Sequence, residues 1–357
     1  MLKIALVFNY EGYLHDNIFT GESDNVAFHY VNHHLQNFFE ILKDEIGRRG
    51  DEIHTFDYYE SVSPADVYLF IDYPIRPLIT NFHKRLKFYH TQMKILKTPG
   101  IQKKILLMWE SPAHNRRNFN INTHKFFHTI LSYKKYHEEK YVYFPYFVPE
   151  ITQELSINSI DEKTFQNKKL SCMIAGNKAT RRNNSGYVKR YEIIDYFDDK
   201  PDDFDLYGVG WEKPVGTRQI IKGIYYGKKY VKSVPKCFKG MVASKIATYN
   251  NYKFAFAIEN ELDCKGYVTE KIFDVLLSDA VPIYNGENIY DGEISRGAFI
   301  DINDFSNMQN LYNFLRNMSF EEYKKFYDAK IDYLQSENFK RFTYAYSIEK
   351  LVQILYS

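Results

Sequence analysis

One stretch, residues 252–286, limits what this chain can fold into more than any other part of its sequence. It opens with the apolar run FAFAI, which predicts a buried strand, and the run stops at a Glu-Asn pair. A loop leads to Thr269, a residue type that caps helices, and then to apolar residues at three- and four-residue spacing. The run VPIYNG predicts the next parallel strand. Strand, loop, helix and strand together predict one βαβ unit of a Rossmann-like sheet.

Polar side chains occupy the positions of this unit where parallel sheets bind ligands, beyond the carboxyl ends of strands and at helix N-termini. They are Glu259, Asn260, Glu270 and Lys271. A phosphate group placed there would meet free backbone N–H groups and the ammonium group of Lys271. The Thr-Glu-Lys string by itself also fits an ordinary βαβ unit with a solvated ion pair, because the first turn of a helix favours Glu.

Three strings of this stretch resemble the signature of the α1,3/α1,4-fucosyltransferase family: F-x-F-x-I-E-N, G-Y-V-T-E-K-I and A-V-P-I-Y-N-G. The resemblance implies a domain that binds GDP-fucose without a metal ion or another cofactor in its site. The chain departs from the family pattern at Glu261, where relatives usually have Ser, and in the unusual pair Cys264-Lys265. These departures concern the contacts of the loop rather than the fold.

The resemblance also implies roles for individual residues. Lys271 would hold the pyrophosphate of the donor, and Glu270 would bind hydroxyl groups of ribose or fucose. The remaining residues would shape the nucleotide-sugar pocket: Glu259, Asn260, Tyr267 and Thr269.

The length of the chain predicts two domains, since 357 residues are too many for one ordinary core. Basic and acidic residues number 47 and 45, so the charge gives no reason to expect nucleic acid as a partner. Three widely spaced cysteines suggest neither a disulfide framework nor a zinc site, and they fit a reducing compartment. The sequence shows neither a signal peptide nor an apolar run of membrane length. We therefore expect a cytoplasmic protein with at most a peripheral contact to the inner face of a membrane.

Alternating strand-like and helical patterns predict a Rossmann-like, acceptor-binding domain over residues 1–150. No Gly-rich cluster follows its first strand, which speaks against a dinucleotide cofactor. The run KKILLMWESP predicts a buried strand that delivers Glu110 to its carboxyl end. A carboxylate there can act as a general base, or it can only cap the following turn. The family resemblance implies the role of the base for Glu110.

A polar segment without periodicity predicts a linker over 151–169, followed by a nucleotide-sugar-binding domain over 170–339. The C-terminal helix, 340–357, is expected to pack back on the first domain. Family members place a phosphate-binding Arg near the start of the helix that reads YVKRYEIIDYF here. Arg190 fits that register best and Arg182 is the reserve, and an Arg side chain can hold two phosphate oxygens at once.

A D-x-D string, Asp203 and Asp205, can hold a divalent metal ion in other sugar-transferring folds. It lies in an acidic run ahead of a strand, and the family works without a bound metal, so we interpret both residues as surface residues. The polar loops 11–25 and 112–123 are expected to select the acceptor.

The sequence thus predicts an α/β, GT-B-like protein whose two Rossmann-like domains face a central cleft. The resemblance implies an inverting α1,3-fucosyltransferase that moves L-fucose from GDP-fucose to the 3-hydroxyl of GlcNAc or Glc. Its acceptor would be an oligosaccharide or a lipid-linked glycan, as in lipopolysaccharide or capsule biosynthesis. Two other interpretations stay open: a transferase of another nucleotide-linked deoxy sugar, and a non-catalytic glycan-binding protein. The sequence predicts no nucleic-acid partner and leaves the oligomeric state undetermined.

Overall fold

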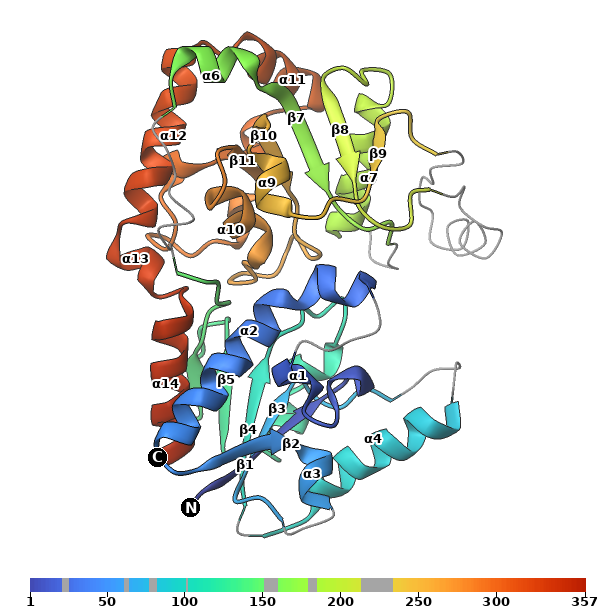
Figure 1. Cartoon of the computed structure of the whole chain (residues 1–357), viewed down its shortest axis with the longest axis vertical. Coiled ribbons are helices and arrows are strands. Elements are labelled where there is room, and N and C mark those ends of the chain that lie inside the picture. Colours follow the sequence, from blue (N-terminus) through green and yellow to red (C-terminus); the bar gives the residue numbers. More distant parts are fainter. Residues whose placement is uncertain are drawn as a thin grey trace. The chain divides into compact units, whose positions relative to one another are not determined.

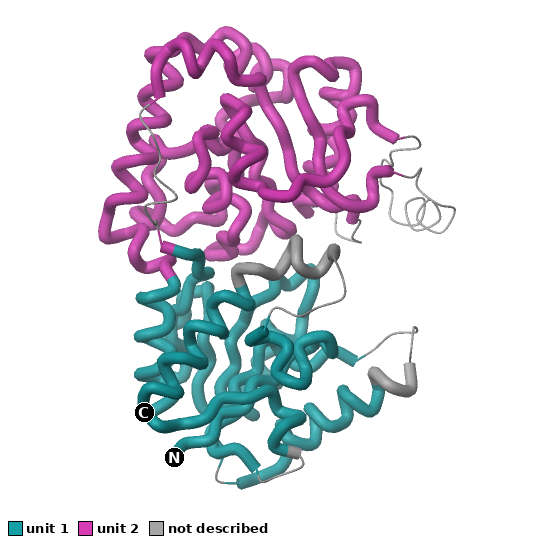
Figure 2. The backbone as a smooth tube through the Cα atoms, in the orientation of Figure 1, with its two compact units in different colours: residues 1–149, 344–357 teal, residues 150–343 magenta. Residues whose placement is uncertain are grey.

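A computed structural model covers the chain and describes residues 1–20, 26–60, 64–76, 82–100, 102–150, 160–178, 185–212 and 234–357. The chain forms two compact units, which Figure 1 colours by sequence and Figure 2 by unit. Unit 1 comprises Met1–Pro149 and Tyr344–Ser357, and unit 2 comprises Glu150–Thr343. The chain therefore crosses from one unit to the other twice.

The described part of unit 1 contains a six-stranded sheet in the order β2-β1-β3-β4-β5-β6, with every neighbouring pair parallel. Its strands are β1 (Lys3–Phe8), β2 (Glu52–Thr55), β3 (Val67–Ile71), β4 (Lys103–Met108), β5 (Thr129–Ser132) and β6 (Tyr141–Tyr143). After the lysines that begin β1 and β4, the central strands are apolar, because helices cover both faces of a parallel sheet.

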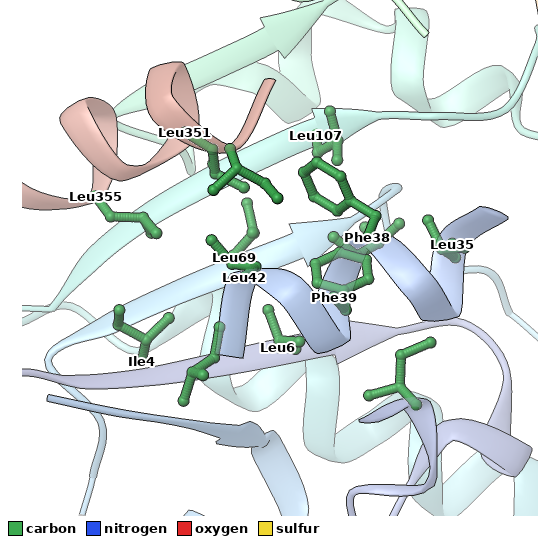
Figure 3. Close-up of a cluster of buried hydrophobic side chains, with 14 of the residues drawn as sticks. Ile4, Leu6, Leu35, Phe38, Phe39, Leu42, Leu69, Leu107, Leu351 and Leu355 are labelled. Carbon is green, nitrogen blue, oxygen red and sulfur yellow. The ribbon is translucent and has the colours of Figure 1, made fainter. Parts of the chain in front are cut away.

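Four longer helices flank this sheet: α2 (Val26–Arg48), α3 (Phe56–Glu60), α4 (Phe82–Lys97) and α14 (Tyr344–Tyr356). One core lies between the sheet, α2 and the C-terminal helix α14 (Figure 3). Its buried side chains include Leu6 and Leu107 from the sheet, Phe38 and Leu42 from α2, and Leu351 from α14. The apolar residues of α14 recur at helical spacing, which gives this helix one buried stripe.

Unit 2 repeats the architecture with a second six-stranded parallel sheet among its described residues, in the order β12-β11-β10-β7-β8-β9. Its strands are β7 (Lys169–Ile174), β8 (Phe204–Tyr207), β9 (Phe238–Gly240), β10 (Tyr252–Ala257), β11 (Val281–Tyr284) and β12 (Ile300–Asp301). The two parallel sheets with their helices confirm the predicted α/β, GT-B-like fold class.

The helices of unit 2 are α6 (Glu162–Asn167), α7 (Gly186–Phe197), α9 (Lys245–Tyr249), α10 (Glu270–Leu276), α11 (Met308–Asn317), α12 (Phe320–Leu334) and α13 (Glu337–Lys340). Side chains of α7, α11 and α12 share one core with the central strands. The predicted βαβ unit is β10, α10 and β11, and β10 pairs directly with β11.

Two segments differ in structure from their predictions. Part of the polar loop predicted over 11–25 folds into two short helices, η1 (Glu11–Tyr13) and α1 (Asn17–Thr20), because Ile18 and Phe19 are buried in the core of unit 1. Helix α6 and the start of β7 lie inside the range predicted as the linker, while residues 151–159 lie outside the described residues.

Candidate active site

A fully buried carboxylate, that of Glu259, organises the carboxyl end of β10. Its Oε1 accepts a hydrogen bond from the backbone N–H of Thr269 at 2.7 Å, and its Oε2 accepts one from the Thr269 hydroxyl at 2.7 Å. The Tyr284 hydroxyl at the end of β11 also donates to Glu259, at 3.2 Å. Burial and the neighbouring Glu259 raise the pKa of Tyr284 well above its usual value, which keeps this donor protonated. Glu259 therefore joins the ends of two strands to the start of α10.

Thr269 occupies the N-cap position of α10, as predicted, but its side chain makes no capping hydrogen bond. Its hydroxyl donates to Glu259 instead and accepts from Lys271 Nζ at 2.8 Å. The expectation that this side chain caps the helix is therefore wrong. A capping side-chain oxygen accepts from a backbone N–H of the first turn, whereas the Thr269 hydroxyl oxygen accepts from the Lys271 ammonium group instead.

Lys271 places an ammonium group beside two carboxylates. Its Nζ lies 3.0 Å from Glu270 Oε1 and 3.4 Å from Glu259 Oε2, and 21% of its side chain is exposed. Burial acts to lower the pKa of Lys271, but Glu270 and Glu259 outweigh it and raise the pKa above its usual value. The group is therefore a permanent cation at the carboxyl edge of the sheet.

Arg190 brings a second cation to the same place from α7. Its guanidinium donates to Asn260 Oδ1 at 3.0 Å and to the backbone oxygen of Ile258. Burial lowers its pKa, and the charges of Arg190 and Lys271 are close enough to interact. The buried Nε of Arg190 has no hydrogen-bond partner among the described residues.

Hydrogen bonds from η4 (Gly286–Asn288) hold the loop that contains Tyr267. The side-chain Nδ2 of Asn288 donates to the backbone oxygens of Glu261 at 2.9 Å and Tyr267 at 3.4 Å. The backbone oxygen of Asn288 accepts from the backbone N–H of Gly266 at 2.7 Å. The Tyr267 side chain is only 3% exposed. Like Glu259 and Thr269, this residue is placed to position the loop more than to present a free polar group.

The structure thus brings most of the predicted nucleotide-sugar residues into one cluster, between the carboxyl end of β10, the start of α10 and the first turns of α7. The members of this cluster are Arg190, Glu259, Asn260, Tyr267, Thr269, Glu270 and Lys271. The reserve residue Arg182 falls in 179–184, outside the described residues.

Unit 2 also contains two pockets. One, of about 740 Å³, is lined by the first residues of β7 and β10, whereas ligands of parallel sheets bind at the carboxyl ends. Another, of about 310 Å³, lies beyond β10 and β11, but neither Arg190 nor Lys271 lines it. We therefore take the cationic cluster, and neither pocket, as the candidate site of unit 2.

Glu110 lies two residues beyond β4 in unit 1, with 38% of its side chain exposed. Its Oε2 is 3.5 Å from His114 Nδ1. The turn that follows closes on the backbone oxygen of Ser111, which accepts from the N–H groups of His114 at 3.0 Å and Asn115 at 2.9 Å. The carboxylate of Glu110 is therefore not what closes this turn, and it stands partly open to solvent.

Comparison with known proteins decides the family. Residues 166–353, which include the whole cationic cluster, match the family model described as Glycosyltransferase family 10 (fucosyltransferase) C-term. The chain belongs to glycosyltransferase family 10.

Individual relatives of the family 10 chain match smaller parts of it. The α-(1,3)-fucosyltransferase B of Drosophila melanogaster is 38% identical over 81 residues, which are 22% of this chain and 18% of that protein. The 4-galactosyl-N-acetylglucosaminide 3-α-L-fucosyltransferase 9 of Mus musculus is 22% identical over 239 residues, which are 66% of this chain and 55% of that protein. The matches thus span less than two thirds of the length of these curated relatives.

The fold has structural neighbours far beyond the family. An α-glucosyltransferase solved in complex with UDP and a 13-mer DNA superposes with a TM-score of 0.58 at 11% identity, covering 100% of both chains. At that identity the likeness is one of fold alone. No helix in the described ranges of the family 10 chain is long and apolar enough to cross a membrane.

In the D-x-D string of the family 10 chain, Asp205 is not the surface residue that the sequence suggested. Asp205 is only 4% exposed, accepts from the Tyr252 hydroxyl at 2.6 Å, and pairs with Lys169 at 2.7 Å. Asp203 pairs with Arg316 at 2.9 Å. The interpretation was wrong for Asp205 because β8 turns this residue inward. Both carboxylates face cations of the protein, and the described residues contain no group of three or more metal-ligating side chains.

Sequence reasoning missed Asp72, which follows β3 directly and lies beside Glu110. Asp72 is 6% exposed, and its Oδ1 accepts from the backbone N–H groups of Trp109 at 2.8 Å and Glu110 at 3.0 Å. Burial, followed by the charge of Glu110, raises the pKa of Asp72 to about 7. The signal was present in the sequence, since an acidic residue ends the strand run DVYLFID next to the strand that carries Glu110.

Proposed function

We propose that this family 10 chain is an inverting fucosyltransferase that moves L-fucose from GDP-fucose to a glycan hydroxyl, the 3-hydroxyl of GlcNAc or Glc. The observation that carries the proposal is the pair of cations, Arg190 and Lys271, at the carboxyl edge of the unit 2 sheet. The names of the relatives from Drosophila melanogaster and Mus musculus support α1,3 transfer of fucose.

The two cations suit the chemistry of the leaving group. Glycosyl transfer from GDP-fucose passes through a cationic sugar and leaves a nucleoside diphosphate on which negative charge accumulates. Fixed positive groups that face this charge lower the barrier, because they need no reorganisation during the reaction. We assign this task to Lys271 Nζ and to the guanidinium of Arg190. Charge neutralisation then rests on side chains rather than on a metal ion.

Glu270 and its neighbours would hold the rest of the donor. The Glu270 carboxylate already pairs with Lys271, and it can turn to accept hydrogen bonds from ribose or fucose hydroxyls. Buried Glu259 would keep Thr269 and Lys271 in register, and Asn260 would do the same for Arg190.

Glu110 of unit 1 would take the proton from the acceptor hydroxyl. Its side chain is partly exposed at the carboxyl end of a strand, as a general base must be to reach a substrate. His114, 3.5 Å away, would orient the carboxylate. The acceptor is proposed to be an oligosaccharide or a lipid-linked glycan of lipopolysaccharide or capsule type, made in the cytoplasm.

An assay of the purified chain with GDP-fucose and a panel of lactose, N-acetyllactosamine and type I acceptors tests the proposal. We expect a fucosylated product with an α1,3 linkage, and undiminished activity after treatment with EDTA. Transfer only from another nucleotide-linked deoxy sugar would keep the scaffold but replace the donor. Calorimetry that shows glycan binding without GDP binding would reject the enzyme in favour of a glycan-binding protein.

A further inference from the structure

We propose that Asp72 is a positioning residue for Glu110: its buried carboxyl group holds the end of β4 so that the Glu110 carboxylate meets the acceptor hydroxyl. This inference rests on the proposed function, because it assumes that Glu110 is the base. Asp72 acts through the backbone and touches no substrate.

The position of Asp72 follows from the pairing of two neighbouring strands (Figure 1). β3 and β4 are parallel and in register up to the pair Ile71 and Leu107, and Asp72 N donates to the Leu107 oxygen at 2.9 Å. The backbone ladder ends there. From this point the side chain of Asp72 continues it, since Oδ1 accepts from both Trp109 N and Glu110 N. One carboxyl oxygen thus extends the contact between the two strands from Leu107 to Glu110.

The backbone of Asp72 is strained to make this contact. Its φ is +67°, in the left-handed region that residues other than glycine rarely adopt. Such a conformation persists only where the surrounding contacts enforce it, and it is concentrated at functional sites. Here the left-handed conformation of Asp72 lets the chain after β3 turn away from β4, while the Asp72 side chain stays in contact with the end of β4.

A buried amide completes the arrangement around the Glu110 backbone. Asn118 Nδ2 donates to Asp72 Oδ1 at 2.5 Å and to the Glu110 oxygen at 3.4 Å, and Asn118 Oδ1 accepts from Tyr73 N at 2.8 Å. The Tyr133 hydroxyl adds a second hydrogen bond to the Glu110 oxygen, at 3.3 Å. Both backbone polar groups of Glu110 are therefore held, while its carboxylate remains partly exposed. A fixed backbone with an exposed carboxylate fits a side chain that reacts with a substrate.

Steady-state kinetics of Asp72→Ala and Asp72→Asn in the full chain test the inference. Asp72→Ala frees the end of β4, and a misplacement of about 1 Å costs about 100-fold in rate, so we expect kcat to fall about 100-fold. GDP affinity measured by calorimetry should stay within about twofold of the wild-type value, because the substitution leaves the cationic cluster of unit 2 unchanged. Asp72→Asn keeps the acceptor oxygen and should restore kcat to within about 10-fold of the wild type.

A double-mutant cycle separates positioning from a general loss of stability. If Asp72 acts through Glu110, adding Asp72→Ala to Glu110→Gln lowers kcat no further than Glu110→Gln alone. The matched control is Lys104→Met, at the other end of β4, which removes buried hydrogen bonds to the oxygens of Leu96 and Thr98. This control should lower the melting temperature and leave kcat near the wild-type value.

Three results would overturn the inference: unchanged kcat in Asp72→Ala, additive losses in the cycle, or an equal kcat loss in Lys104→Met. Should Asp72→Ala fail to fold, Asn118→Ala in the same cycle takes its place. A wild-type chain that transfers no sugar refutes the proposed function instead.

In that case acrylamide quenching of Trp109 fluorescence, measured in a Trp211→Phe background, tests whether Asp72 holds the end of β4. Quenching should increase when Asp72→Ala frees the backbone N–H of Trp109. Unchanged quenching would contradict the role of Asp72 in holding this segment.

Discussion

At the scale of single residues, each unit places charged groups beside one another. In unit 2 the Lys271 ammonium and the Arg190 guanidinium stand among Glu259 and Glu270. In unit 1 a buried carboxyl group, Asp72, lies beside a partly exposed one, Glu110. Each group has its own consequence for rate or stability.

Lys271→Ala removes one of the two cations proposed to face the departing diphosphate. Loss of a single electrostatic stabiliser costs about 2.7–4 kcal/mol in barrier, so we expect kcat to fall about 100- to 1,000-fold in the transfer assay. Lys324→Ala, which breaks an exposed ion pair with Asp328 on α12, is the control and should leave kcat unchanged. Near-normal turnover of Lys271→Ala would refute this assignment.

Asp72 should make the stability of the protein depend on pH. Because its pKa is raised from 3.8 to about 7 in the folded state, folding takes up a proton between these two pH values. The resulting stabilisation is fully present below pH 3.8 and is lost as the pH rises through about 7. The side chain of Asn does not titrate in this pH range, so the stability of Asp72→Asn should lack this pH dependence.

Urea unfolding of both proteins at pH 5 and pH 8 measures this effect. The free energy of unfolding of Asp72→Asn, relative to wild type, should rise by about 2–3 kcal/mol between the two pH values. An equal difference at both pH values would show that Asp72 is already ionised at pH 5.

At the scale of secondary-structure elements, the decisive contact joins the start of α7 to the loop after β10. Gly186 N donates to the Asn260 oxygen at 3.2 Å, and Ser185 forms a bridge with Glu261. This contact allows Arg190, one turn along α7, to reach Asn260 and Ile258. Close approach of the two backbones is therefore a condition for the cationic cluster.

Gly186→Ala should break this contact. An added Cβ would lie 1.5 Å from the Glu259 oxygen, which is backbone and cannot swing aside. We expect a loss of about 1–3 kcal/mol in the free energy of unfolding and weaker GDP binding in calorimetry, since Arg190 moves with α7. Gly47→Ala near the end of α2 is the matched control. No atom lies within 4 Å of its added Cβ, so stability should rise by about 0.5–1 kcal/mol.

At the scale of the whole molecule, the chain closes unit 1 with its own C-terminal end. α14 returns after Thr343, and its first backbone N–H donates to the Val148 oxygen at 3.0 Å. Lys350 Nζ donates to the Tyr143 oxygen at 2.9 Å. The stability of unit 1 therefore depends on residues that follow all of unit 2 in the sequence.

Leu351→Ala tests this dependence, because the side chain is fully buried in the core of unit 1. Deleting a buried Leu side chain costs about 2–5 kcal/mol. The chain has two tryptophans, Trp109 in unit 1 and Trp211 in unit 2, and single-Trp variants report each unit separately during unfolding. We expect Leu351→Ala to destabilise the Trp109 transition and to spare the Trp211 transition. Gln353→Ala, on the exposed side of α14, should change neither.

The fold class could be predicted from the sequence alone, and so could the stretch that carries the family signature. Apolar runs and helical spacing are local patterns, and the strings around Glu259, Thr269 and Lys271 lie close together along the chain. Such patterns survive without knowledge of any long-range contact. Hence the βαβ unit of β10, α10 and β11, and the family, were both within reach of sequence analysis.

Only the tertiary structure decided which polar groups meet. Asp72 and Glu110 are 38 residues apart, and Arg190 and Asn260 are 70 residues apart. The inward turn of Asp205 depends on a partner from elsewhere in the chain, since Tyr252 lies 47 residues further along the sequence. Hydrogen bonds to buried carboxylates have no period in the sequence, because their partners are set by strand order and packing rather than by spacing along the chain.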